Sequence, residues 1–93
     1  MSTLSPDLPT LKKVTGSVTV SSVSAGGSKK QSVSLSSRYL VLHAYVSTTT
    51  TDAEVELVNG SANGNGFVVK AINNGAEAQD VVVNYTVWVI ERS

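Results

Sequence analysis

Hydrophobic and polar residues alternate along most of this chain, so the dominant period is two residues rather than the three to four of an amphipathic helix. The alternation is clearest near the C-terminus, where every second residue from 81 to 89 is valine or tyrosine. Val, Ser and Thr are abundant elsewhere, and β-branched side chains pack well on a pleated surface. The pattern predicts six strands, over residues 14–23, 31–35, 39–47, 53–58, 67–72 and 80–91.

Two of the predicted strands are apolar on both faces. In residues 39–47 the tyrosines and Val41 alternate with leucine, alanine and valine. In residues 80–91 the face opposite the valine row still carries a tryptophan and an isoleucine. A strand with one face in water does not have this composition, so the second faces need cover. We expect that cover to be another subunit, and the candidate oligomer interface comprises Leu40, Leu42, Val82, Trp88 and Ile90.

Trp88 leaves three interpretations open. Its indole offers apolar area and one N–H donor, which suits either a subunit interface or a sugar-stacking platform. Ordinary burial beneath the N-terminal segment is the third interpretation. The tyrosines of the third predicted strand, Tyr39 and Tyr45, are expected in the core rather than in a ligand site.

The strands are separated by short segments rich in Gly, Asn and Ser, which are turn-forming residues. This arrangement predicts an all-β fold, a six- to eight-stranded antiparallel β-sandwich of jelly-roll or immunoglobulin-like type with no substantial helix. Two prolines near the start predict an extended N-terminal arm over residues 1–13, followed by a single domain over 14–93. The loop 59–66 is the richest in Asn and Gly, and its candidate binding residues are Asn59, Asn63 and Asn65.

Composition narrows the choice of partners. Lys plus Arg and Asp plus Glu number 7 each, and a chain of zero net charge is a poor ligand for phosphate backbones, so we expect no nucleic acid. No stretch reaches the roughly 20 apolar residues of a membrane span, and the start does not resemble a signal peptide. With 93 residues and no cysteine, the chain has a small core and no disulfide. Association with copies of itself is the remaining source of stability.

No pattern in the sequence is typical of a catalytic or metal site. His43 is the single histidine, and because a metal needs several convergent ligands, we expect His43 to be a partly buried polar residue. No serine lies in a Gly-x-Ser-x-Gly segment. Asp52, Glu54 and Glu56 line one face of the fourth strand, either as a calcium site or, as we favour, as charges that protect a sheet edge. The sequence therefore predicts no enzyme activity, no catalytic residue, no metal and no cofactor.

The strand segments also resemble a known class of protein. Gly-Ser-Val-Thr-Val at 16–20 and Gln-Ser-Val-Ser-Leu at 31–35, on either side of a glycine turn, resemble the opening hairpin of small β-sandwich domains in tailed-bacteriophage virions. Val-Ser at 46–47, Leu-Val-Asn at 57–59 and Asn-Tyr-Thr-Val-Trp-Val-Ile at 84–90 continue the likeness, which covers about residues 14–92. The stretch from Gly-Phe-Val-Val at 66–69 to Trp88 is also similar to the H-type lectin-like domains that cap some phage fibres.

This resemblance implies a structural protein of the virion, made in the host cytoplasm and assembled as a trimer or higher cyclic oligomer. Its partners would be itself and other virion proteins. Fibre domains usually follow a long shaft, whereas only some 13 residues precede the predicted domain, so a capsid decoration or small tail accessory subunit fits better than a fibre tip. The alternative is a carbohydrate-binding module of a tail fibre or tail tip that reads a host surface glycan.

Overall fold

The computed structural model describes residues 10–91, and this range is all-β and contains no helix. The prediction of an all-β chain is confirmed for the described range. The strands are β1 (Thr10–Val23), β2 (Ser28–Ser34), β3 (Tyr39–Ser47), β4 (Ala53–Leu57), β5 (Gly66–Asn73) and β6 (Gln79–Glu91).

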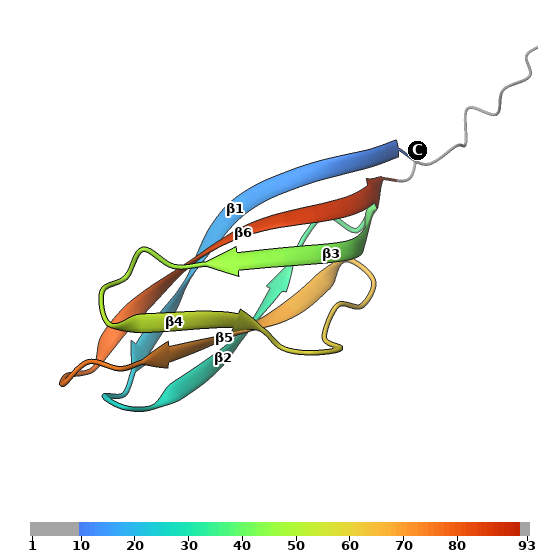
Figure 1. Ribbon diagram of the computed structural model, residues 1–93. Helices are drawn as coiled ribbons and strands as arrows, with labels where there is room; N and C mark the ends of the chain where they lie inside the picture. The colour runs from blue at the N-terminus through green and yellow to red at the C-terminus, as the bar shows by residue number, and fades with distance from the viewer. Residues whose placement is uncertain (1–9, 92–93) are drawn as a thin grey trace, which may run out of the picture.

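The strands form two antiparallel sheets of three strands each. The first sheet has the order β1-β6-β3 and the second has the order β2-β5-β4, so the last strand of the chain lies at the centre of the first sheet. The two sheets lie face to face in two layers, with β1 against β2 and β3 against β4 (Figure 1). Each sheet therefore has one inner face toward the core and one outer face.

The inner face of β6 is the valine row that the alternation predicts. Val81, Val83, Val87 and Val89 have no exposed surface. Nine of the twelve buried hydrophobic residues are valines, whose stiff branched side chains fill the narrow space between two pleated sheets. The buried hydrophobic core consists of Val20, Val23, Val33, Val41, Ala44, Phe67, Val69, Ala71, Val81, Val83, Val87 and Val89.

Tyr85 interrupts this valine row, and Gly16 accommodates it. The two residues are paired directly across β1 and β6, on the inner face of the sheet. The Tyr85 ring lies over Gly16 and meets Phe67 edge-on at a centroid distance of 5.6 Å. A Cβ atom at position 16 would lie 2.5 Å from the Tyr85 hydroxyl oxygen, so only glycine fits there.

Strand β1 begins at Thr10 rather than near residue 14. Residues 10–13 belong to the predicted arm 1–13, but they pair with 88–91 of β6. Residues 10–13 contain no proline, so each has a backbone N–H that can hydrogen-bond, and the pairing with β6 extends to Thr10. The rest of the predicted arm, residues 1–9, lies outside the described residues.

A β-bulge in β3 changes which residues face the core. Val41 pairs with Val89 and His43 pairs with Trp88, so Leu42 is one extra residue on the β3 side. Val41 and Ala44 are buried, whereas Leu42 and His43 between them are both exposed. An extra residue in one strand of a pair interrupts the strict alternation of faces. The regular alternation predicted for 39–47 is therefore wrong beyond Val41.

The bulge separates the two tyrosines of β3. Tyr39 precedes it and packs against the core, as predicted. Tyr45 follows it and is 59% exposed, so its prediction as a core residue is wrong. His43 is exposed rather than partly buried, which is a second error with the same cause.

Candidate functional site

The outer face of the first sheet carries rows of residues that run across all three strands. Direct cross-strand partners have side chains on the same face of a sheet, so the register defines each row. The first row joins Leu11 of β1, Ile90 of β6 and Leu40 of β3. It lies at the end of the sheet where β1 begins and is entirely apolar.

The second and third rows hold the aromatic rings. Lys13, Trp88 and His43 form the second row, with Leu42 added to it by the bulge. Tyr45 belongs to the third row, where it is paired with Thr86. Further along the sheet the rows become small and polar, as in Ser17, Asn84 and Ser47.

The side chains of this apolar end contact one another but stay open to solvent. The Lys13 ammonium lies 6.0 Å from the Trp88 ring centroid, and His43 meets Tyr45 edge-on at 4.5 Å. Leu11 is 63%, Leu42 49% and Trp88 37% exposed. Together with Tyr45 these are the exposed large hydrophobic residues of the described range.

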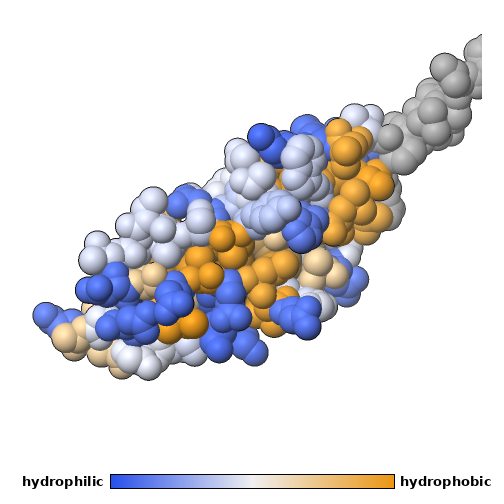
Figure 2. Space-filling view, viewed as in Figure 1, coloured by the Kyte–Doolittle hydropathy of each residue, from blue (hydrophilic) through white to orange (hydrophobic). Residues whose placement is uncertain are grey.

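We call this surface the outer apolar patch, and it comprises Leu11, Lys13, Leu40, Leu42, His43, Tyr45, Trp88 and Ile90. Figure 2 shows apolar surface at the end of the molecule where β6 ends and β3 begins, and a second apolar area over the middle of the molecule. Lys13 carries the one permanent charge of the patch, because the other members include no Asp, Glu, Lys or Arg. Contiguous exposed apolar surface of this kind is typical of a docking site.

Four of the five residues predicted for an oligomer interface fall together in the outer apolar patch: Leu40, Leu42, Trp88 and Ile90. Val82 shares their face but lies six residues from Trp88 along β6, about 20 Å away. Thr48 donates a hydrogen bond of 2.6 Å to the Val82 carbonyl, and the Val82 N–H donates to the Thr50 hydroxyl at 2.9 Å. Val82 thus lies beyond the end of β3, where two threonine side chains of the following loop satisfy its backbone N–H and carbonyl.

The sequence did not identify Leu11, Lys13, His43 or Tyr45 as members of the patch. Leu11 and Lys13 lie within the predicted arm. Residues 10–13 are all exposed and the alternation of β1 begins only at Val14, so no local pattern marks these two residues as part of the strand. The exposure of His43 and Tyr45 on the outer face depends on the bulge, and nothing in a single sequence indicates where a bulge will form.

The asparagine loop between β4 and β5 is held by hydrogen bonds. Asn65 donates from Nδ2 to the Leu35 carbonyl at 2.6 Å, and its own carbonyl accepts from the Leu35 N–H at 2.9 Å. The Val41 N–H donates to the Gly64 carbonyl at 2.8 Å. The loop therefore ties the end of β2 to the start of β3, and the predicted binding role of Asn65 would compete with this bond. Asn59 and Asn63 are exposed.

The acidic strand β4 lies at an edge of the second sheet, because it pairs with β5 alone in the described residues. Glu54 and Glu56 are exposed, as expected of charges on a wet face. Glu54 accepts a hydrogen bond of 2.7 Å from Nδ2 of Asn74, and Glu56 lies opposite Lys70 on β5. No group of three or more His, Asp or Glu side chains in residues 10–91 is placed to hold a metal ion.

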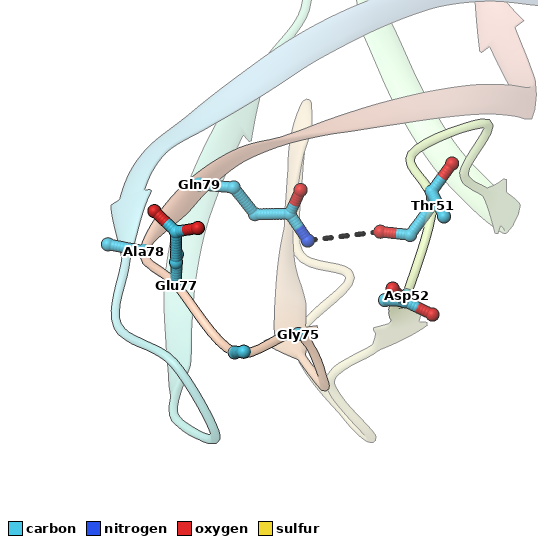
Figure 3. A pocket seen from close by; sticks show the side chains of 7 residues that line it. Thr51, Asp52, Gly75, Glu77, Ala78 and Gln79 are labelled. Atoms are coloured by element: carbon cyan, nitrogen blue, oxygen red, sulfur yellow. Dashed lines mark hydrogen bonds between the residues drawn. The ribbon is translucent and has the colours of Figure 1, made fainter.

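A cleft of about 360 Å³ lies at the opposite end of the molecule from the patch, between the β3–β4 and β5–β6 turns. Its walls are residues 51–52 and 75–79. Gln79 reaches across it and donates a hydrogen bond of 3.0 Å to the Thr51 carbonyl (Figure 3). The hydrogen bond from Gln79 to Thr51 joins the two turns.

A small charged cluster lies on the other side of the first sheet from the patch. Lys12 donates a hydrogen bond of 3.2 Å to the Tyr39 hydroxyl, and its ammonium is 3.6 Å from the Glu91 carboxylate. The hydrogen bond to Tyr39 and the charge of Glu91 raise the pKa of Lys12 above its ordinary value of 10.5. The interaction favours the folded chain below pH 10.5 and is lost as the pH rises through the raised pKa.

Comparison with protein-family models, with curated proteins and with solved structures finds no match for this chain. Within residues 10–91 there is no helix long and apolar enough to cross a membrane.

Proposed function

We propose that this chain is a non-enzymatic structural subunit that docks onto a larger assembly through the outer apolar patch. The observation that carries this proposal is the position of Leu11, Leu42, Tyr45 and Trp88 in adjacent rows of one sheet face, all exposed. Apolar area drives association roughly in proportion to the surface removed from water, and aromatic anchors contribute most. The partner surface is apolar, with a site that accepts the Lys13 ammonium.

We propose further that the assembly is the virion of a tailed bacteriophage, where the chain acts as a capsid decoration or small tail accessory subunit. Support for this setting is the resemblance of residues 14–92 to small virion domains. The two sheets around one buried core support the same class of β-sandwich. Docking through one face also leaves the second sheet on the outside of the assembly.

Particle binding tests both parts of the proposal. Purified chain is mixed with particles from a phage stock whose copy of the gene is deleted, and bound chain is measured after sedimentation. Trp88→Ser removes the central ring of the patch, and a hot-spot residue of this kind costs about 2 kcal/mol or more, which is a loss of affinity of about thirtyfold. We expect wild-type chain to bind and Trp88→Ser to lose binding.

Ile72→Ser is the matched control, because Ile72 is a partly buried apolar residue on the outer face of the second sheet. Its binding should equal that of the wild type. Equal losses in Ile72→Ser and Trp88→Ser would contradict docking through the patch. Failure of wild-type chain to bind, together with its absence from mature particles by mass spectrometry, would contradict the virion setting.

A second candidate function is carbohydrate binding, favoured by the exposed rings of Trp88 and Tyr45 in neighbouring rows. Sugars stack on such rings through their apolar C–H faces. Trp88 is the single tryptophan, so its fluorescence reports any ligand on the patch directly. A shift of Trp88 emission on titration with bacterial surface glycans, absent from the Tyr45→Ala variant, would favour this function over protein docking.

A further inference from the structure

We propose that two copies of this chain associate by antiparallel pairing of their β1 strands, edge to edge, about a two-fold axis at Ser17. The surface involved is the free edge of β1 and not the outer apolar patch. The inference rests on β1 alone and does not depend on the virion setting.

Strand β1 is the outermost strand on its side of the first sheet (Figure 1). Among the described residues, its backbone pairs with β6 and with no other strand. Residues 14–20 contain no charged residue and no proline, and five of the seven are Val or Thr. A long uncharged edge of β-forming residues is a template for pairing with another chain.

The other three sheet edges carry features that oppose such pairing. Strand β4 has Glu54 and Glu56, and strand β2 has Lys29 and Lys30. Strand β3 contains the bulge, and its Val41 N–H is already bonded to Gly64. Charges and bulges are the usual protections of an edge strand. The edge of β1 over residues 14–20 has none of them.

The sequence of this edge is self-complementary about Ser17. With Ser17 opposite its own copy, Thr15 meets Thr19, Gly16 meets Val18 and Val14 meets Val20. Thr–Thr and β-branched pairs are favourable cross-strand partners. This register pairs even-numbered residues, which face the core, with even-numbered residues. It pairs odd-numbered residues, which face outward, with odd-numbered residues, so both sheets keep the same inner and outer faces.

Both ends of the paired segment are defined in the structure. At one end Lys12 and Lys13 begin the charged part of β1. At the other end a bulge lies between Val20 and Val23, where Ser22 has a positive φ of 55°. Lys29 donates to the Ser21 carbonyl at 2.8 Å and so occupies the edge just past Val20. The free edge is therefore the seven residues that form the self-complementary segment.

The pairing has a consequence for docking. A two-fold axis at Ser17 runs perpendicular to the sheet, so the outer faces of both copies point the same way on one continuous six-stranded sheet. The two outer apolar patches then contact a single target surface together. Two linked contacts raise the overall affinity above that of either contact alone.

Sedimentation velocity of the full chain over a series of concentrations tests the pairing. The wild type should be a dimer in equilibrium with monomer. Ser17→Lys places two like charges directly opposite each other at the axis, and it should raise the dissociation constant by about tenfold or more. Ser17 is exposed and faces the neutral Asn84 within the monomer, so the variant should fold normally by circular dichroism.

Cysteine cross-linking tests the register, because the native chain has no cysteine. Ser17→Cys should form a disulfide-linked dimer on mild oxidation, since direct cross-strand partners are close enough to bridge. Ser32→Cys, at another exposed serine, on strand β2, is the control and should cross-link only slowly. Chains with Thr15→Cys should cross-link with chains carrying Thr19→Cys but not with themselves.

Each outcome decides the proposal. A wild type that stays monomeric at high concentration overturns it, and so does a trimer. A dimer that survives Ser17→Lys but dissociates in Trp88→Ser also overturns it, because that pair of results assigns the contact to the outer apolar patch. Loss of particle binding in Trp88→Ser with an intact dimer supports both inferences separately.

Discussion

Asn73 is a polar residue whose side chain hydrogen-bonds several segments together at one end of the molecule. It is the buried polar residue of the described range, and its side chain has no exposed surface. Nδ2 donates to the carbonyls of Val23, at 3.0 Å, and Glu77, at 2.8 Å. Oδ1 accepts from the Gly75 N–H at 2.8 Å and from Nε2 of Gln79 at 2.9 Å. All four hydrogen-bonding positions of the amide are used, so it joins β1, β5 and the β5–β6 turn.

Replacing Asn73 by alanine should destabilise the protein strongly. Each buried group left without a partner costs about 1–3 kcal/mol, and the substitution removes partners from two carbonyls at once. We expect the free energy of unfolding to fall by about 3 kcal/mol in chemical denaturation.

The neighbouring residue is the control. Asn74 is exposed, and its side chain makes a hydrogen bond to Glu54. Asn74→Ala should change the free energy of unfolding by about 0.5 kcal/mol or less. Similar losses in the two variants would contradict a special role for Asn73.

At the scale of the element, the bulge in β3 determines the composition of the outer apolar patch. It places Leu42 and His43 on the same side and turns Tyr45 outward. Without the extra residue the strand alternates regularly, with Val41 and Ala44 still on the core face. The bulge thus adds one apolar side chain to the patch while the core stays filled.

Deleting Leu42 should therefore be tolerated. The deletion removes the bulge, keeps Val41 and Ala44 inward and keeps His43 opposite Trp88. We expect the stability to change by about 1 kcal/mol, with particle binding reduced because the patch loses a leucine. Circular dichroism and denaturation measure the first effect.

Deleting Thr86 from β6 is the comparison, since β6 has no extra residue to lose. That deletion turns Trp88 toward the core and Val87 toward solvent, so the chain should not fold. A ΔLeu42 variant that also fails to fold would show that the bulge is needed for the core as well as the patch.

At the scale of the whole molecule, neither sheet has a core of its own. The buried residues Val69 and Ala71 of the second sheet pack against the valines of the first in one cluster. Separating the sheets would expose both inner faces to water and lose the free energy of burying their apolar area. The two sheets should therefore unfold together.

Urea denaturation at a protein concentration below dimer formation tests this expectation. Trp88 fluorescence reports the first sheet, and far-ultraviolet circular dichroism reports both sheets. The two curves should share one midpoint, with a slope of about 1 kcal/mol per molar urea. Separate midpoints would mean that one sheet unfolds without the other.

Much of the fold could be predicted from the sequence because alternation records burial locally. The valine row of β6, the inner face of β1 up to Val20 and the absence of helix follow from period two and β-branched residues. The apolar second face of β6 placed Trp88 and Ile90 on the face opposite the valine row, where the register puts them. These features depend on residues close together in one strand, which a sequence displays directly.

The tertiary structure alone decided the rest. The placement of β6 between β1 and β3, and the use of Asn73 as a buried bridge, depend on contacts between residues far apart in the chain. The bulge that exposes His43 and Tyr45 is a mismatch between two strands, which neither strand's pattern contains by itself. The sequence by itself determined which residues alternate, whereas only the pairing of strands determined which face each residue occupies.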